Sequence, residues 1–244
     1  MAEQGIDRAL KQAARPLRKL GVEVSRPRAD LTDFLAYNRV DLVLDIGANT
    51  GQFGANLRIG GYKGDILSFE PSAKDFEALS RTAARDRGWR VVRKGLGQEA
   101  GSAEIAISEL SVFNSIRTLS GDGLSFDSRS KVVRHEQIEL TTLDAVLADC
   151  VGKRCFLKID TQGFEEPILR GGAEYLTTVI GVQLELPVIH LYDNVWSMIE
   201  AMQFMAERGF VAAQFASVNY RKDDPTSGLE FDCLFRNERI PVAF

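Results

Sequence analysis

Acidic side chains stand at or near the ends of four short apolar runs in this 244-residue chain. Glu70 and Asp160 each end such a run, Asp45 lies near the end of another, and Glu185 interrupts a fourth. A carboxylate at the end of a strand can orient a hydroxyl group, accept its proton or hold a divalent metal ion. A buried carboxylate such as Glu185 is costly unless it is paired or protonated. These residues therefore predict a polar site at one edge of a sheet.

A glycine-rich turn follows the first of these runs. The sequence VDLVLDIGANTGQFG, residues 40–54, begins as a short apolar strand and continues through Gly47, Asn49 and Gly51. Glycine lets the backbone turn tightly and approach a ligand closely, and a helix beginning just after the turn would point free N–H groups at the same place. Glu70 lies about 20 residues further on, where a Rossmann-type fold places a carboxylate on ribose hydroxyls. We expect a nucleoside-containing ligand at the ends of the first two strands.

The turn departs from the dinucleotide fingerprint G-x-G-x-x-G, in which the middle glycine lets pyrophosphate lie against the backbone. Asn49 replaces that glycine, and Asp45 stands on the strand just before the turn. A carboxylate there would repel a pyrophosphate but would suit an ammonium or a sulfonium group. S-adenosylmethionine carries both positive groups and no phosphate, so the turn favours this cofactor over NAD(P). The alternative for this stretch alone is an ordinary glycine-rich turn of a parallel α/β domain.

The motifs DxGANxG and FEP resemble the first two motifs of class I S-adenosylmethionine-dependent methyltransferases. Three further segments, FLKIDTQGFE (156–165), VQLE (182–185) and Leu191–Tyr192, resemble the FkbM family. The resemblance covers residues 40–236 and implies an enzyme that methylates hydroxyl groups of small molecules, often sugars or natural products. The cofactor-binding positions that it implies are Asp45, Gly47, Asn49, Gly51, Phe53, Glu70, Pro71, Gly95 and Leu96. Gln98 stands where the third motif usually has an acid, so a simple strand exit is the alternative for Gly95 and Leu96.

Four residues near the expected methyl acceptor could take part in catalysis: Asp160, Glu185, His190 and Lys158. Histidine titrates near neutrality and is the commonest general base, although a lone loop histidine is more often a surface residue and the FkbM pattern often has proline there. Lys158 is expected to pair with Asp160 or Glu185. Those two carboxylates could instead bind Mg²⁺, because hard oxygen ligands suit that ion. The sequence leaves these options open, and we assign no metal ligand.

The elements that must position these residues alternate between strand and helix. Apolar runs predict strands at 42–46, 65–70, 89–92, 155–160, 181–186, 210–215 and 228–235, with further strands at 103–107 and 137–140. Helical spacing predicts a helix from Ser72 to Arg87 and another that Asp193 caps and that ends at Gly209. The segment 111–130 is rich in Ser, Gly and Asp and reads as a long loop that borders the site.

These elements predict an α/β fold with a doubly wound, Rossmann-like sheet of about seven strands. The turn at 222–228 favours a hairpin, so the last strand is expected to insert antiparallel between the fifth and sixth strands, as in class I methyltransferases. Residues 40–244 would form the methyltransferase domain, and residues 1–39 a helical extension. The extension carries a basic helix with one apolar face, which is expected to pack on the domain or on a second subunit; a lid or a membrane-surface contact is the alternative.

Composition excludes several other classes. The net charge of −4 and the absence of a basic stripe outside the N-terminus argue against a nucleic-acid substrate. Three cysteines without paired spacing indicate free thiols in a reducing compartment, so we expect a cytoplasmic protein. No apolar run approaches the length of a membrane span.

Three functions from different classes remain. The first is an S-adenosylmethionine-dependent O-methyltransferase acting on a small hydroxylated molecule; the sequence leaves its assembly open, with a homodimer as one option. The second is a non-catalytic nucleoside-binding protein, in which the cofactor pocket is kept and the acceptor chemistry is lost. The third is an NAD(P)-dependent oxidoreductase, against which the replaced glycine argues.

Overall fold

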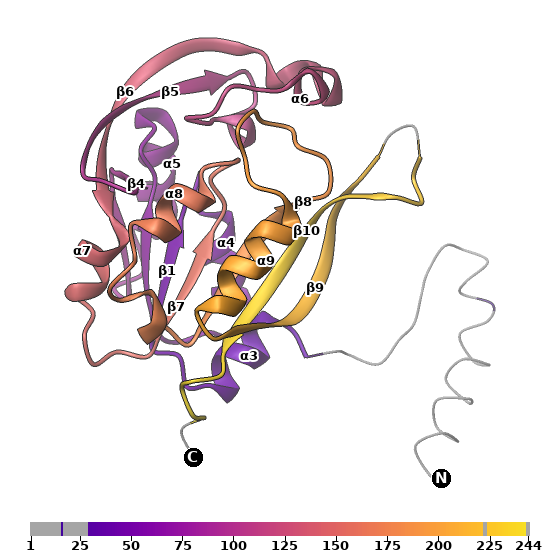
Figure 1. The fold of residues 1–244 in the computed structure, drawn as a ribbon. Coiled ribbons are helices and arrows are strands. Elements are labelled where there is room, and N and C mark those ends of the chain that lie inside the picture. The colour runs from indigo at the N-terminus through magenta and orange to yellow at the C-terminus, as the bar shows by residue number, and fades with distance from the viewer. Residues whose placement is uncertain (1–15, 17–28, 222–223, 243–244) are drawn as a thin grey trace.

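The computed structural model describes residues 16, 29–221 and 224–242, and its largest feature is a seven-stranded sheet (Figure 1). Its strands are β1 (Leu42–Ile46), β2 (Asp65–Phe69), β3 (Trp89–Val92), β7 (Cys155–Ile159), β8 (Gly181–Pro187), β9 (Phe210–Tyr220) and β10 (Gly228–Asn237). Their order is β3-β2-β1-β7-β8-β10-β9, and β10 runs antiparallel to both of its neighbours. The predicted sheet, with its last strand inserted antiparallel, is confirmed.

Strand β1 lies inside the sheet, next to its central strand β7, and pairs in parallel with β2 and β7. All five residues of β1 and all five of β7 are buried, which is why both read as short, nearly continuous apolar runs. Because the three strands are parallel, the turns that leave β1, β2 and β7 lie at one edge of the sheet. Gly47, Glu70 and Asp160 directly follow these three strands.

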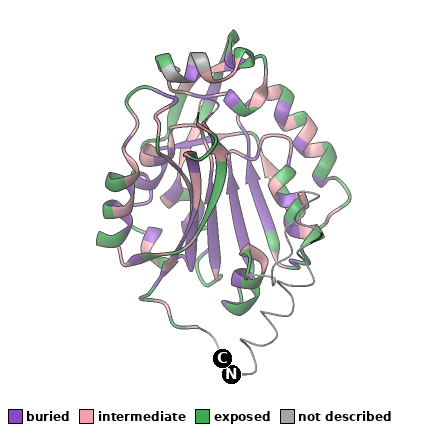
Figure 2. Ribbon diagram, turned by 90° about the vertical axis from the view of Figure 1, so that its right-hand side faces the viewer, coloured by how far each residue is buried: buried purple, intermediate pink, exposed green. Residues whose placement is uncertain are grey.

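Helices cover both faces of the sheet (Figure 2). One face carries α3 (Leu31–Tyr37), α4 (Gln52–Ile59) and α5 (Ala73–Ala83), and the other carries α7 (Leu143–Ala148), α8 (Glu165–Arg170) and α9 (Met198–Glu207). Leu57 and Leu79 pack with Val43 of β1 on the first face. Ile168 and Phe204 belong to the same apolar cluster as Leu44 on the second. Burial of these two apolar layers is the main favourable term that holds the helices on the sheet.

A second, three-stranded sheet arches over the end of the first, at the top of Figure 1. Its strands are β4 (Gly95–Gly97), β5 (Gly101–Ser108) and β6 (Val132–Thr142), in the order β4-β6-β5. The segment between β5 and β6 contains the 3₁₀ turns η1 (Ser111–Phe113) and η2 (Ser128–Ser130) and the short helix α6 (Gly121–Phe126). A further 3₁₀ turn, η3 (Leu176–Thr178), precedes β8. The sequence predicted two of these strands but not that they form a sheet of their own.

Two predicted helix boundaries are wrong. Helix α9 begins at Met198, because Ser197 rather than Asp193 accepts a hydrogen bond from the backbone N–H of Glu200 and forms a capping box with it. Helix α5 ends at Ala83, four residues before Arg87.

The short helix α3 precedes β1, with Asp30 as its cap. The basic helix predicted within residues 6–20 lies outside the described residues. Cys150, Cys155 and Cys233 are free and buried, as expected. Within the described ranges, no helix is both long enough and apolar enough to cross a bilayer.

Candidate active site

The turn between β1 and α4 is held against the turn that follows β7. Gly47 has a φ of +79°, and a Cβ atom there would lie 1.9 Å from the carbonyl oxygen of Asp160. Only glycine therefore fits at this position. Asn49 also has a positive φ, of 48°, and Gly51, with a φ of 92°, is the N-cap of α4. This close packing of the backbone brings the predicted cofactor turn beside Asp160.

Glu70 is a buried carboxylate that accepts two backbone hydrogen bonds. The N–H of Asn49 donates to Oε2 and the N–H of Ser72 donates to Oε1, both at 2.9 Å. Burial raises the pKa of Glu70 to about 7, although these two hydrogen bonds act to lower it. Ser72, which was expected to cap α5 through its side chain, instead donates its hydroxyl to Asp75. Glu70 thus links the ends of β1 and β2 and keeps lone pairs for a ligand.

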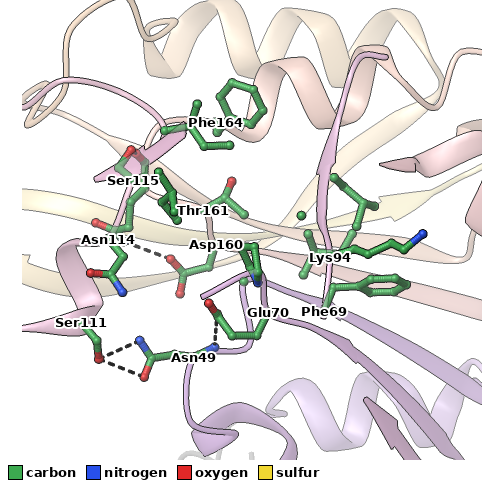
Figure 3. Close-up of a pocket in the computed structure, with 18 of the residues that line it drawn as sticks. Asn49, Phe69, Glu70, Lys94, Ser111, Asn114, Ser115, Asp160, Thr161 and Phe164 are labelled. Carbon is green, nitrogen blue, oxygen red and sulfur yellow. Dashed lines mark hydrogen bonds between the residues drawn. The ribbon is translucent and has the colours of Figure 1, made fainter. Parts of the chain in front are cut away.

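A cavity opens above these two turns and holds about 720 Å³ of empty space, open solvent included. The predicted cofactor-binding residues in its wall are Gly47, Asn49, Glu70, Pro71, Gly95 and Leu96. Figure 3 shows Glu70 and Asp160 close together in this wall, with Ser111, Asn114 and Ser115 to one side of them. Gln98 is exposed and does not line the cavity. We call this space the nucleoside cavity.

A strap formed by residues 111–116 closes one side of the nucleoside cavity. The amide of Asn49 donates to the hydroxyl of Ser111 at 3.1 Å, and Asn114 donates to Asp75 at 3.0 Å. At its other end, Ser115 donates its hydroxyl to the carbonyl of Gln162 at 2.7 Å. The expectation that the 111–130 segment borders the site agrees with this arrangement.

Asp45 and Lys158 lie beneath the nucleoside cavity and not in its wall. Asp45 is fully buried, accepts a hydrogen bond of 3.0 Å from Ser68 and lies 3.5 Å from the ammonium of Lys158. Burial raises the pKa of Asp45, and the charge of Lys158 opposes that change. Phe53, another predicted cofactor residue, packs under Lys158, with 5.4 Å between the ammonium and the ring centre. Contact of Asp45 or Phe53 with the cofactor stays a prediction.

Asp160 stands at the tip of β7, and both of its carboxylate oxygens are held. Lys158 lies 3.2 Å from Oδ2, and the side-chain amide of Gln162 donates to Oδ1 at 3.0 Å. Burial acts to lower the pKa of Lys158, but the charges of Asp160 and Asp45 outweigh it and raise that pKa. The expected Lys158–Asp160 ion pair is therefore present.

Glu185 borders a second, smaller cavity of about 360 Å³ on the other side of Gln162. Gln162 lines both cavities and donates to Glu185 at 3.1 Å. Burial and the nearby charge of Asp160 raise the pKa of Glu185 well above its usual range. The other walls of this space, which we call the acceptor-side cavity, are Gly163, Glu165, Pro187, Leu191, Tyr192, Val195, Trp196 and Glu230.

Two further acids in the wall of the acceptor-side cavity, Glu165 and Glu230, accept hydrogen bonds from neighbouring groups. Glu165 is buried at the start of α8, where its carboxylate accepts the N–H of Thr161 at 2.8 Å and the N–H of Gly163 at 3.2 Å. These two bonds indicate a structural role for Glu165 at the start of α8. Glu230 was not considered from the sequence; it is 7% exposed and accepts a bond of 2.9 Å from Asn219.

The side chain of His190 lines neither of these two cavities. Its backbone carbonyl accepts a hydrogen bond of 2.7 Å from Ser120. The residue that reaches the site from this loop is Tyr192, whose hydroxyl donates to the side-chain oxygen of Gln162 at 3.0 Å. The structure therefore does not bring His190 together with Asp160 and Glu185.

Sequence reasoning missed Gln162, which donates hydrogen bonds to two of the predicted catalytic residues, Asp160 and Glu185. A signal was present, because Gln162 lies two residues after Asp160 and directly before Gly163. An amide at the exit of a strand, beside a glycine that permits a turn, is placed to hydrogen-bond a carboxylate at the tip of that strand.

The pair of Asp160 and Glu185 does not fit the Mg²⁺ alternative. The amide of Gln162 donates to both carboxylates, and the ammonium of Lys158 occupies the other side of Asp160. In the ranges that the structure describes, no three His, Cys, Asp or Glu side chains are grouped so that they could hold a metal ion.

The family model for the methyltransferase FkbM domain matches residues 45–212, which contain both turns, Glu70, Gln162 and Glu185. This chain belongs to the FkbM methyltransferase family. The described sheet is the one that such a methyltransferase requires, and the inserted β10 distinguishes it from a dehydrogenase sheet. This FkbM-family protein is an S-adenosylmethionine-dependent methyltransferase.

Solved structures of similar fold include other methyltransferases. The fibrillarin/Nop5p complex is 15% identical with a TM-score of 0.46, covering 81% of this chain and 72% of that chain. An rRNA methylase from Streptococcus thermophilus is 11% identical with a TM-score of 0.46, covering 88% and 99%. TrmK of M. capricolum, in complex with S-adenosylhomocysteine, is 7% identical with a TM-score of 0.45, covering 86% and 69%. No curated protein matches this chain.

The nucleoside cavity fits the cofactor of this family. Glu70 presents a buried carboxylate whose oxygens each hold one backbone N–H and can accept further hydrogen bonds from ribose hydroxyls. The turn at Gly47 carries no side chain that would block its approach. Gly95 and Leu96, both buried, also line the cavity.

Proposed function

We propose that this protein transfers a methyl group from S-adenosylmethionine to a hydroxyl group of a small molecule, with Asp160 as the general base. The observation that carries the proposal is the position of Asp160. Its carboxylate lies in the wall of the nucleoside cavity, and its partner Gln162 separates that cavity from the acceptor-side cavity. A base placed between cofactor and acceptor is what O-methylation needs.

The cofactor is assigned to the nucleoside cavity. Glu70 would accept hydrogen bonds from the ribose hydroxyls, and Gly47 and Asn49 would contact the amino-acid part through the backbone. Gly95, Leu96 and Pro71 would pack on the adenine. Asp45 supports this arrangement from below, because its charge lies beneath the turn and holds Lys158 in place.

The chemistry requires a deprotonated acceptor oxygen. When bound, the cofactor supplies an electrophilic methyl group on a sulfonium. Asp160 would take the proton of the acceptor hydroxyl, and the ammonium of Lys158, 3.2 Å away, would orient the carboxylate for that transfer. The strap of residues 111–116 and the walls of the two cavities would exclude water. No step uses a metal ion.

A small acceptor suits the acceptor-side cavity. Tyr192, Trp196 and Leu191 give it apolar walls beside the polar edge of Glu185, and its roughly 360 Å³ of empty space, open solvent included, would receive the acceptor hydroxyl and the atoms next to it. The net charge of −4 disfavours a polyanionic acceptor. RNA therefore enters the acceptor screen as a test arm and not as an expectation.

Thermal unfolding with S-adenosylhomocysteine, NAD and NADP tests the cofactor assignment. A ligand at about 100 times its dissociation constant adds roughly 2.7 kcal/mol to the free energy of unfolding, so a clear rise in Tm is expected with S-adenosylhomocysteine alone. Transfer of a labelled methyl group to a panel of sugars, hydroxylated natural products and RNA then tests the acceptor. Cofactor binding without transfer to any acceptor would instead indicate a non-catalytic binding protein.

A further inference from the structure

The side chain of Gln162 makes a hydrogen-bond bridge between the two carboxylates of the site. Its Nε2 atom lies 3.0 Å from Oδ1 of Asp160 and 3.1 Å from Oε2 of Glu185. A side-chain amide carries two N–H donors, so each carboxylate can receive one of them. Asp160 has Lys158 as a second partner, whereas Glu185 faces other acids.

The orientation of this amide is set by Tyr192. The tyrosine hydroxyl is buried, and it lies 3.0 Å from Oε1 of Gln162. Burial and the neighbouring Glu230 and Glu185 raise the pKa of Tyr192, so the hydroxyl keeps its proton and can donate it. If the amide were turned over, its oxygen would face two carboxylates and its NH₂ group would face this donor. The observed orientation is therefore the one that satisfies all four groups.

The backbone of Gln162 is held in a conformation that a non-glycine residue rarely adopts. Its φ is 55°, in the left-handed region, and the following Gly163 has a φ of 92°. The hydroxyl of Ser115, from the strap, fixes the carbonyl of Gln162 at 2.7 Å. Left-handed backbone costs energy for residues with a side chain and is kept where the surroundings impose it. Both the backbone and the side chain of Gln162 are thus positioned by groups outside β7.

We propose that Gln162 is a positioning residue that holds Asp160 and Glu185 in place and fixes which of them is free to act as the base; this rests on the proposed function. Because the neutral amide donates to both carboxylates, they can lie close together between the two cavities without a metal ion. Asp160 has an amide and an ammonium on separate oxygens, so both of its oxygens are held. Glu185, with the amide alone, binds a proton more readily.

The groups that face this pair decide the sign of the effect. They are Lys158 on β7, Glu165 on α8, Tyr192 on the loop after β8, and Glu230 and Asp232 on β10. All but Lys158 and the neutral Tyr192 are acids. Removing the amide would therefore leave the two carboxylates repelling each other among further acids, and the apparent pKa of the pair in the folded protein would rise.

The test is the pH dependence of stability, which needs no acceptor. Tm is measured from pH 5 to pH 8.5 for the wild type, Gln162→Met and Tyr192→Phe, with Gln137→Met as the matched control. Gln137 is exposed and donates to Glu104 at 3.3 Å, far along the chain from the site. For Gln162→Met, the Tm deficit relative to wild type should grow as pH rises, because the ionised pair has lost its donor. Tyr192→Phe should show the same trend more weakly, and the control should show a constant difference.

If methyl transfer to an acceptor is found, the rising limb of the pH profile of kcat/KM should move up by about one pH unit in Gln162→Met. A Tm deficit that is equal at pH 5 and pH 8.5 in both site variants would overturn the proposal, because a purely structural role predicts that result. If Gln162→Met does not fold, Tyr192→Phe decides in the same way. If S-adenosylhomocysteine does not raise the Tm of the wild type, the proposed function is refuted. The pH dependence of Tm in the variants would still test whether Gln162 bridges the two carboxylates.

Discussion

Replacing Glu70 with glutamine should change how stability depends on pH. In the wild type, burial raises the pKa of Glu70 from its ordinary value of 4.5 to about 7. The shift is the difference between these values, about 2.5 units, and at 1.36 kcal/mol per unit it corresponds to roughly 3 kcal/mol. An acid whose pKa is raised by folding destabilises the folded state as pH climbs through that window. This destabilisation should develop between about pH 4.5 and pH 7 and is absent from Glu70→Gln.

The variant also loses something that does not depend on pH. A glutamine has one oxygen, so it can accept from only one of the N–H groups of Asn49 and Ser72, and the unmatched donor costs about 1–3 kcal/mol. At pH 5, Glu70→Gln should therefore be less stable than wild type by about that amount. By pH 8.5 the difference should have moved in favour of the variant by roughly 3 kcal/mol.

Urea unfolding of both proteins at half-unit pH intervals, without ligand, measures this difference directly. Most other titrating groups are common to the two proteins and cancel. Binding of S-adenosylhomocysteine, followed by calorimetry, should weaken at least tenfold in the variant at pH 8, since a carboxylate is the better acceptor for ribose hydroxyls. A stability difference that is constant from pH 5 to pH 8.5 would refute the reasoning, because it would mean that folding does not raise the pKa of Glu70.

Three further substitutions test other parts of the site. Gly47→Ala places a Cβ 1.9 Å from the carbonyl oxygen of Asp160 at a φ of +79°, so thermal unfolding should show a loss of at least ~2 kcal/mol together with weaker S-adenosylhomocysteine binding; unchanged binding would contradict the packing of the two turns. Lys158→Met leaves the fully buried Asp45 without its counter-ion and should cost about 3–5 kcal/mol at pH 8, less at pH 5 where Asp45 can bind a proton; an equal loss at both pH values would argue against the ion pair. Asp160→Asn should lower kcat/KM for the acceptor by about 10²–10⁴-fold while S-adenosylhomocysteine affinity, measured by calorimetry, changes little; retained methyl transfer would exclude Asp160 as the base.

The central strands and the cofactor turn could be predicted from the sequence because both depend on local patterns, whereas the place of the last strand followed from the family resemblance. Fully buried parallel strands such as β1 and β7 give continuous apolar runs, and the left-handed positions at Gly47 and Gly51 need glycine. Glu70 follows from its spacing after that turn. Local patterns are therefore enough to place one wall of the nucleoside cavity.

The remaining features depend on contacts between segments that are far apart in the chain. Asp45 and Glu70 are both acids at strand ends, yet Asp45 lies beneath the cavity and Glu70 in its wall, because Lys158 of β7 reaches under the turn. The choice of Tyr192 over His190 depends on how one loop after β8 folds back on Gln162. The periodicity of the sequence therefore does not predict which residue of this loop reaches the site.

The place of β10 in the sheet has a consequence for how the chain folds during synthesis. Strand β9 is at the edge of the sheet and joins it through β10, while the edge of β8 that faces away from β7 is also paired by β10. Until residues 228–237 have left the ribosome, one half of the sheet therefore presents two unpaired strand edges, and such edges template aggregation. Strand β10 pairs with both edges at once, so this half of the molecule stays unprotected until residues 228–237 are available.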